Sequence, residues 1–283
     1  QDSTPVRLTL GGDTVQLTAI TQDVGNAAEE IDASYDGAEM TEVIEADRTY
    51  AGLITAIKEL GGIDYHWIDI APQVGADGGQ PGGGIRNGYL FNPLRIELVE
   101  SSVHSLGADD VAYEGSRKPL VAHFREKKSG KLIACINVHL ASKRHQSSIF
   151  APDKPGFDPR QSVRVQQAGI IRDELLELRD QGIGYYVTGD FNDTEDSETL
   201  SEILGQESVN LVMSLPETER YDYNHRGKLQ VLMHGIVSKK LAQSGAEYEI
   251  IHGNELLGVQ PGQLGDKPSD HAYVIARLKM SGA

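Results

Sequence analysis

Three short polar clusters in this chain each follow an apolar run. They are Asn-Val-His-Leu at residues 137–140, Gly-Asp-Phe-Asn-Asp at residues 189–193, and Ser-Asp-His at residues 269–271. Side chains two positions apart in a strand point to the same face, so Asn137 shares a face with His139, and Asp190 with Asn192. Each cluster taken singly is also common as turn chemistry or as a structural hydrogen bond. The hypothesis of one site therefore depends on all three clusters together.

This set of side chains fits the hydrolysis of phosphate esters. Carboxylates and amides supply the oxygen ligands that hard divalent cations prefer. An aspartate and asparagine pair such as Asp190 and Asn192 can hold a nucleophilic water and a phosphate oxygen. A histidine such as His139 can act as a base or stabilise the charge that develops in the transition state.

The bulk composition fits a globular protein with a sizeable core. The chain has 283 residues, of which 39% are hydrophobic and 24% charged. The net charge of −16 argues against tight, non-specific DNA binding in the absence of metal, because nucleic-acid binders usually present a basic surface. The single cysteine, Cys135, cannot form an internal disulfide, and we expect a buried, inert thiol.

The chain has no targeting or membrane segment that can be recognised. No run approaches the roughly 20 apolar residues that a membrane helix needs, and residues 1–12 contain no apolar run of a signal peptide. We expect a secreted protein whose signal has already been removed, with a cytoplasmic protein as the alternative.

The elements that would position the clusters are mostly strands. Apolar runs predict strands at residues 88–91, 96–100, 120–124, 132–140, 184–188, 230–238 and 272–278. Helical spacing of apolar residues predicts helices at residues 48–60 and 164–178. Many strands with few helices, and no strict βαβ alternation, predict a sandwich of mixed sheets with helices outside.

The first part of the chain has less pattern. Residues 15–24 have room for one strand, and residues 77–84 form a glycine-rich loop. This loop lacks the Gly-Lys-Ser/Thr that follows in nucleotide-binding phosphate loops, so we interpret it as a connection between strands. No composition shift divides the chain, and we expect residues 1–283 to form one domain.

Taken in this order, the three clusters resemble those of the endonuclease/exonuclease/phosphatase superfamily, and the nearest branch is similar to bacterial extracellular nucleases. The likeness runs over residues 18–278, so residues 1–17 match poorly. It includes the glycine-rich segment 77–93 and the Ser-Arg-Lys-Pro-Leu segment 116–120. It implies the pancreatic-deoxyribonuclease-like fold, an α/β (α+β) four-layered α/β/β/α sandwich of two mixed, mainly antiparallel sheets flanked by helices. It also implies a monomeric, metal-dependent nuclease that cleaves DNA or RNA with Mg²⁺, or with Mn²⁺ or Ca²⁺.

The resemblance assigns roles to individual residues. Asp190 and Asn192 would orient the attacking water and contact the phosphate, and His139 would assist at the leaving or non-bridging oxygen. His271 would contact the phosphate or serve as base. Metal ligands would be Asp23 and Asp270, and phosphate contacts would be Arg86, Arg117 and Asn137, where an arginine offers paired donors. Further candidate phosphate contacts are Lys143, Arg144, Arg160 and Arg164.

Three positions depart from the family pattern. Asp23 stands where the family has a metal-binding glutamate, and residues 6–16 contain no strand-end asparagine. The family's Leu-Asp-His-Ile segment reads Leu-Met-His-Gly at residues 232–235. The aspartate of that segment normally orients the histidine of Ser-Asp-His. Because Met233 cannot accept this hydrogen bond, we expect His271 to be less basic and less well oriented, unless His234 or Asp222 compensates.

Two alternative functions stay open. The same metal site could serve a small or lipid phosphoester, which the acidic net charge slightly favours. No aromatic hairpin marks a lipid-surface enzyme, since the only tryptophan, Trp67, sits in a strand-like run. The second alternative is a degenerate member that binds without turnover, for which Met233 and the missing asparagine argue. Affinity for magnesium or manganese would separate it from the enzymes.

Overall fold

The computed structural model describes residues 14–15, 18–20, 46–72, 85–143, 146–147, 152, 156–225, 227–257 and 269–280. The glycine-rich loop at 77–84 and two residues expected at the site, Asp23 and Arg144, lie outside this part of the chain. The strand expected within residues 15–24 is described only at β1 (Thr14–Val15) and β2 (Thr18–Ile20).

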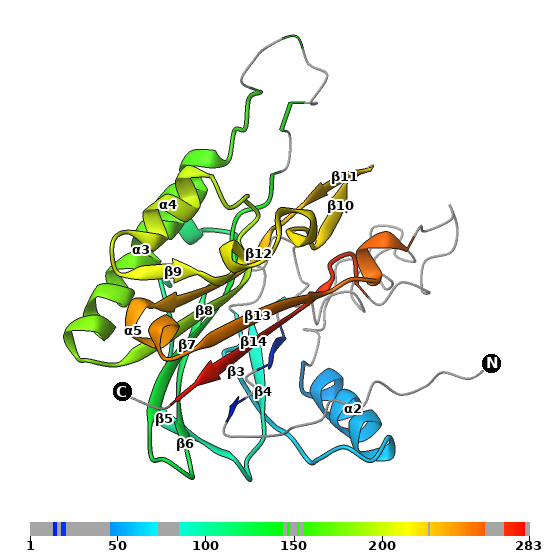
Figure 1. Ribbon diagram of the computed structural model, residues 1–283, viewed down its shortest axis with the longest axis vertical. Coiled ribbons are helices and arrows are strands. Elements are labelled where there is room, and N and C mark those ends of the chain that lie inside the picture. The colour runs from blue at the N-terminus through cyan, green and yellow to red at the C-terminus, as the bar shows by residue number, and fades with distance from the viewer. Residues whose placement is uncertain are drawn as a thin grey trace.

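The central layer is a six-stranded sheet with the strand order β5-β6-β7-β8-β12-β9 (Figure 1). Strands β7 and β8 run parallel, and every other neighbouring pair in the sheet is antiparallel. The strands are β5 (Ile96–Ser105), β6 (Leu120–Glu126), β7 (Leu132–His139), β8 (Gly184–Asp190), β9 (Ser208–Asn210) and β12 (Met233–Ser238).

The second layer consists of two three-stranded antiparallel sheets. One has the order β2-β4-β3 and the other the order β1-β14-β13. Their further strands are β3 (His66–Asp69), β4 (Gly88–Phe91), β13 (Ala246–Ile251) and β14 (Tyr273–Lys279). A separate hairpin, β10 (Tyr223–His225) and β11 (Lys228–Gln230), projects beyond the sheets. The single strand expected at 230–238 is thus divided between β11 and β12.

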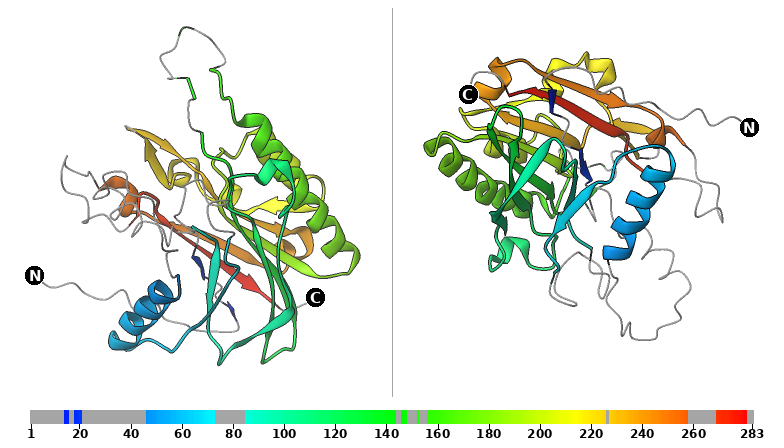
Figure 2. Two further views of the ribbon diagram at one scale, coloured as in Figure 1. Left: turned by 180° about the vertical axis from the view of Figure 1, so that it is seen from behind. Right: turned by 90° about the horizontal axis from the view of Figure 1, so that it is seen from below.

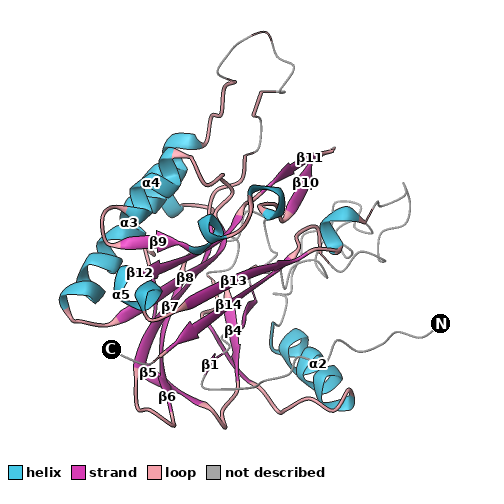
Figure 3. Ribbon diagram, viewed as in Figure 1, coloured by secondary structure: helices cyan, strands magenta, loops and turns pink. Residues whose placement is uncertain are grey.

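Helices lie against the outer face of the six-stranded sheet and against the β2-β4-β3 sheet (Figures 2 and 3). Helix α3 (Gln161–Asp180), with α4 (Glu198–Leu204) beside it, lies against the six-stranded sheet. Helix α2 (Ala46–Glu59) packs Tyr50 and Ile54 against Leu90 of β4. The order of layers is therefore helix, sheet, sheet, helix, as expected. Short elements complete the chain: α5 (Lys239–Gln243) and 3-10 turns η1 (Val111–Tyr113), η2 (Leu211–Ser214), η3 (Glu217–Glu219) and η4 (Asn254–Leu256).

Strand β7 shows how the sequence builds this core. Successive side chains of a strand point to opposite faces. Ile133 and Cys135 accordingly pack toward the second layer, whereas Ala134, Ile136 and Val138 pack toward α3. Both faces are covered, which explains the nearly continuous apolar run. Cys135 is buried as expected, and burial raises the pKa of its thiol, so it is a structural residue.

The sheet brings three strand ends to one edge. The parallel pairing of β7 and β8 places His139 opposite Asp190. Strand β12 runs antiparallel to β8 and begins at this edge, with Met233 opposite Asp190. The bridge between Tyr223 and His271 brings the hairpin and the residues before β14 to the same place. In the described part of the chain, no helix is long and apolar enough to cross a membrane.

Candidate active site

Asp190 lies between two histidines at this edge. Its Oδ2 atom is 3.6 Å from Nε2 of His139 and 3.6 Å from Nε2 of His271. His139 comes from the neighbouring strand, and His271 comes from the segment before β14, 81 positions further along the chain than Asp190. The Asp190 side chain is 8% exposed. The three polar clusters of the sequence therefore meet around one nearly buried carboxylate.

Asp222 orients His271. Its Oδ2 atom lies 2.5 Å from Nδ1 of the imidazole, and the Asp222 side chain is fully buried. Its Oδ1 atom accepts hydrogen bonds from the backbone N–H groups of Leu232, at 2.6 Å, and Met233, at 2.9 Å. Tyr223 stacks on the imidazole with a ring-centroid distance of 4.9 Å. His271 is thus held on two sides.

Asp222 compensates for Met233, one of the two cases that the sequence left open, and His271 is not a weak base. Burial alone would lower its pKa, but the Asp222 hydrogen bond and the nearby Asp190 carboxylate outweigh burial and raise the pKa to about 9. The family pattern has its orienting aspartate at the position of Met233 in β12. In this chain Asp222, directly before the hairpin, provides that carboxylate instead. His234, the other candidate, is buried and contacts Asn210 and the Asp193 carbonyl instead.

Asp190 is an unusually basic carboxylate. Burial raises its pKa to about 6, although His271 and the backbone N–H of Asn192 act in the opposite direction. That N–H donates to Asp190 Oδ1 at 2.7 Å, and the Asn192 amide donates to the Leu140 carbonyl at 3.0 Å. Asn192 has a φ of 50°, a left-handed conformation that asparagine tolerates better than most residues. A carboxylate with a pKa near neutrality suits general-base chemistry.

His139 is a neutral imidazole that accepts a hydrogen bond from Arg117. The distance from Arg117 Nη2 to His139 Nε2 is 2.6 Å. A guanidinium only donates, so Nε2 is unprotonated and the proton sits on Nδ1. Burial, followed by the charges of Arg117 and His271, lowers the His139 pKa well below its usual value. Among the described residues, buried Nδ1 has no hydrogen-bond partner.

Two of the expected phosphate contacts have structural partners. Asn137 is fully buried, and its amide donates to the Gly88 carbonyl at 2.9 Å, linking β7 to β4. A fully buried side chain fits support of the site better than the direct phosphate contact that we expected. Arg86 Nη1 pairs with Asp69 Oδ2 at 3.2 Å. Arg117 is the expected phosphate contact that lies beside His139, next to Asp190.

The cations after β7 are engaged by a second carboxylate, Asp193. Arg164 is fully buried, donates from Nε to Asp193 at 3.1 Å and also binds Asp158, so the expectation of a phosphate contact was wrong. Lys143 pairs with Asp193 Oδ1 at 3.1 Å. Burial would raise the Asp193 pKa, but Lys143 and Arg164 outweigh it and lower this pKa. Arg160 belongs to the turn that precedes α3.

Of the two expected metal ligands, only Asp270 belongs to the described part of the chain. Asp270 is exposed next to His271, and its charge helps to raise the pKa values of His271 and Tyr223, as Asp190 does. Hard oxygen donors of this kind suit Mg²⁺. Within the described residues, no group of three acidic, histidine or cysteine side chains forms a metal site. The other expected ligand, Asp23, lies outside them.

Sequence reasoning missed the buried network behind the site. Asp222 was noted only as one of two residues that might compensate for Met233, and Tyr223 and Asp193 received no role. The Tyr-Asp-Tyr segment at 221–223 carries no motif. The weak signal in the sequence was Gly227, a residue type that favours turns. In the structure Gly227 has a φ of 87°, and the hairpin brings Asp222 back beside Leu232.

Comparison with known proteins supports the fold. No protein-family model matches the chain, and neither does any curated protein. Solved structures do match. TDP2 of D. rerio, complexed with a single-strand DNA product, has a TM-score of 0.53 at 13% identity, covering 80% of this chain and 81% of that one. A Bacteroides vulgatus endonuclease/exonuclease/phosphatase has a TM-score of 0.50 at 17% identity, with 82% and 80% covered. The mannosyl-6-phosphatase Bt3783 of Bacteroides thetaiotaomicron has a TM-score of 0.50 at 14% identity, with 81% of both chains covered. The predicted sandwich is confirmed.

Proposed function

We propose that this chain, which has the fold of the endonuclease/exonuclease/phosphatase superfamily, is a metal-dependent phosphoester hydrolase. The observation that carries the proposal is the position of Asp190 between neutral His139 and charged His271, 3.6 Å from each. Their environments raise both pKa values, that of Asp190 to about 6 and that of His271 to about 9. Near neutral pH Asp190 is therefore an ionised carboxylate that can accept a proton, while His271 stays a cation, and perturbed neighbouring groups of this kind divide acid and base roles.

In the proposed reaction, Asp190 is the base. Ionised above a pH of about 6, it accepts a proton from the attacking water while the water oxygen bonds to phosphorus. The ester oxygen leaves with the bonding electrons. The Asn192 amide orients the water and contacts a phosphate oxygen. This assignment moves the role of base from His271, whose pKa of about 9 keeps it protonated, to Asp190.

Two cationic groups stabilise the transition state. The His271 imidazolium is held by Asp222, and it faces the developing negative charge with its Nε2–H. Arg117 supplies guanidinium donors beside His139. A Mg²⁺ ion held by Asp270, together with Asp23, would supply further positive charge at the phosphate. The Nε2 atom of neutral His139 accepts a hydrogen bond from Arg117 and carries no proton, so it cannot donate to a substrate oxygen. We therefore assign His139 a positioning role at the phosphate.

The substrate class has two candidates. A nucleic-acid diester follows from the sequence resemblance, and the matching D. rerio TDP2 structure holds a single-strand DNA product. A small phosphoester is favoured by the ion pairs of Lys143 and Arg164 with Asp193, because these cations neutralise a buried carboxylate rather than extend toward a DNA backbone. The net charge of −16 points the same way.

The test is hydrolysis of bis(p-nitrophenyl) phosphate and of supercoiled plasmid. Each reaction contains magnesium, manganese or chelator, and the Asp190→Ala protein is assayed in parallel. We expect metal-dependent release of p-nitrophenol that chelator and Asp190→Ala both abolish. Turnover that persists in Asp190→Ala would refute the assigned site. No turnover with either metal, in a protein that melts cooperatively, would favour the degenerate binding member.

A further inference from the structure

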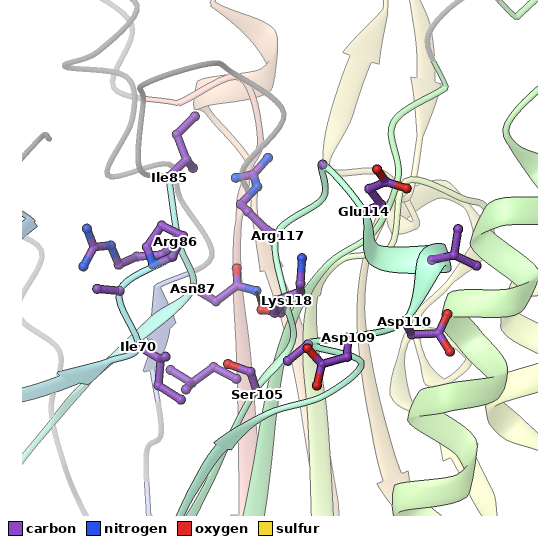
Figure 4. Close-up of a pocket in the computed structure, with 16 residues that line it drawn as sticks. Ile70, Ile85, Arg86, Asn87, Ser105, Asp109, Asp110, Glu114, Arg117 and Lys118 are labelled. Atoms are coloured by element: carbon purple, nitrogen blue, oxygen red, sulfur yellow. Dashed lines mark hydrogen bonds between the residues drawn. The ribbon is translucent and has the colours of Figure 1, made fainter. Parts of the chain in front are cut away.

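A cavity of about 490 Å³ opens beside Arg117 (Figure 4). One wall is residues 85–87, which lead into β4, and the opposite wall is the turn that carries Asp109 and Glu114. Arg117 both lines this cavity and contacts His139 of the catalytic cluster. The volume falls within the range of small-molecule sites. If a substrate phosphate binds at Arg117, this cavity has room for the group that is esterified to it.

Asn87 lines this cavity, and its side chain has a hydrogen-bond acceptor that no described residue uses. The residue is 4% exposed, and its Nδ2 atom donates to the carbonyls of Lys118, at 2.9 Å, and Asn137, at 3.2 Å. Carbonyls only accept, so these contacts fix which end of the amide is nitrogen. The Oδ1 atom is buried and has no donor among the described residues. A buried acceptor without a partner is costly, and a bound hydroxyl or amine would satisfy it.

The other residues that line the cavity limit the kind of ligand that it can bind. Asp109 and Glu114 are exposed carboxylates on the far wall, and they also accept hydrogen bonds only. None of the described residues that line the cavity is aromatic, although nucleobases are usually stacked on aromatic rings.

Two further cations are among the described residues that line the cavity, and both have partners. Arg86 pairs with Asp69, and Lys118 Nζ donates to the backbone carbonyls of Tyr113 and Ser116. The exposed carboxylates of the far wall would repel the next phosphate of a polynucleotide. That wall therefore suits a neutral group that is rich in hydrogen-bond donors.

We propose that this cavity binds the alcohol part of a polyhydroxylated phosphoester, such as a sugar or cyclitol phosphate, and that Asn87 Oδ1 accepts a hydrogen bond from one of its hydroxyls. The inference rests on the proposed hydrolase, because it needs the phosphate at Arg117. It narrows the substrate from phosphoesters in general to esters of polyols. Asn87 then determines specificity, while Asp190 and His271 carry the chemistry.

The experiment compares two substrates that differ only in hydroxyl groups. They are p-nitrophenyl myo-inositol 1-phosphate and p-nitrophenyl cyclohexyl phosphate, which share the leaving group and the ring size. We measure kcat/KM with magnesium for wild type, Asn87→Leu, Asp109→Ala and the matched control Asp173→Ala. Asp173 is exposed on α3 and does not line the cavity. A single-stranded oligonucleotide is assayed beside the two esters.

We expect wild type to prefer the inositol ester by about tenfold or more, because binding groups left unpaired by the cyclohexyl ring penalise it. Asn87→Leu should lower this preference at least about fivefold, Asp109→Ala should lower it as well, and Asp173→Ala should keep it. Asn87→Leu loses two donors to backbone carbonyls, so Asp109→Ala carries the test if Asn87→Leu fails to fold. Three results would overturn the inference while leaving the hydrolase intact. Wild type could hydrolyse both esters at equal rates, both cavity variants could keep the wild-type preference, or the oligonucleotide could be cleaved faster than the esters.

If wild type hydrolyses neither ester nor oligonucleotide, the hydrolase proposal fails, and binding decides the inference separately. Calorimetric titration of the same protein with myo-inositol 1-phosphate and cyclohexyl phosphate gives that answer. Tighter binding of the inositol compound, lost in Asp109→Ala, supports the cavity assignment. Equal affinities refute it.

Discussion

Asp222 Oδ2 lies 2.5 Å from Nδ1 of His271, across 49 positions of sequence, and the same carboxylate caps the backbone at Leu232 and Met233 through Oδ1. One side chain thus fixes both the start of β12 and the orientation of the charged imidazole. The two tasks use different oxygens, so they can be separated by mutation.

Asp222→Asn is expected to cripple turnover with only a moderate effect on folding. Asparagine keeps an acceptor for the two backbone N–H groups but loses the charge that stabilises the imidazolium. By analogy with the orienting aspartate of serine proteases, kcat should fall by about 10²- to 10⁴-fold. An NMR titration in chelator should show the His271 pKa falling from about 9. An unchanged His271 pKa with full activity would show that the contact is not functional.

Met233→Asp is expected not to raise activity in the wild-type background. Met233 is 6% exposed, and a carboxylate there would be buried next to the existing charge of Asp222. Like charges that share a buried site disfavour each other, so the melting temperature should fall. In the Asp222→Asn background, the same substitution should recover part of the lost rate, because β12 then carries the only orienting carboxylate. A gain in the single variant but none in the double variant would contradict this exchange.

Asp190→Asn is expected to stabilise the protein while it abolishes turnover. The pKa of Asp190 is raised to about 6 in the folded state, so ionisation opposes folding. This cost is absent below the unfolded pKa of about 4, grows up to about pH 6 and is complete above it. A shift of about two pKa units corresponds to about 3 kcal/mol as an upper estimate. Denaturant unfolding in chelator at pH 8 and pH 4 measures the free energy of unfolding of both proteins. The variant's advantage should be smaller at pH 4 than at pH 8. A variant that is less stable than wild type at pH 8 would show that Asp190 is compensated in the fold.

Asp193→Asn is expected to destabilise the protein strongly at neutral pH. It would leave the Arg164 guanidinium, which is 0% exposed, with one of its carboxylate partners gone, and breaking a buried pair costs about 3–5 kcal/mol. Because the folded pKa of Asp193 is depressed, its contribution is fully present above about pH 4 and is lost as the pH falls through the folded pKa. The gap in the free energy of unfolding between wild type and variant should therefore narrow as the pH falls below about 4, as measured by urea unfolding. Asp173→Asn, on the exposed face of α3, is the matched control and should show no such gap. A gap that stays constant with pH would mean that the ion pairs do not carry the effect.

Local patterns in the sequence determined the scaffold and the main site residues. Alternation and apolar runs located the strands that end at His139 and Asp190, and helical spacing located α3, because each of these signals depends only on which face of an element is buried. Asn137 and His139, and Asp190 and Asn192, lie together as the strand periodicity required. The family resemblance set the layer order, which the matched structures confirm.

Only the tertiary structure decided which groups act together. Asp222 reaches His271 because a hairpin folds back over the start of β12, a contact between residues 49 positions apart that no local period encodes. Arg164 looked like a free cation in the sequence, but the α3 face that carries it is turned inward to Asp193. The pKa values of Asp190 and His271 follow from burial and from charges that separate strands supply, so they exist only once the sheets have closed.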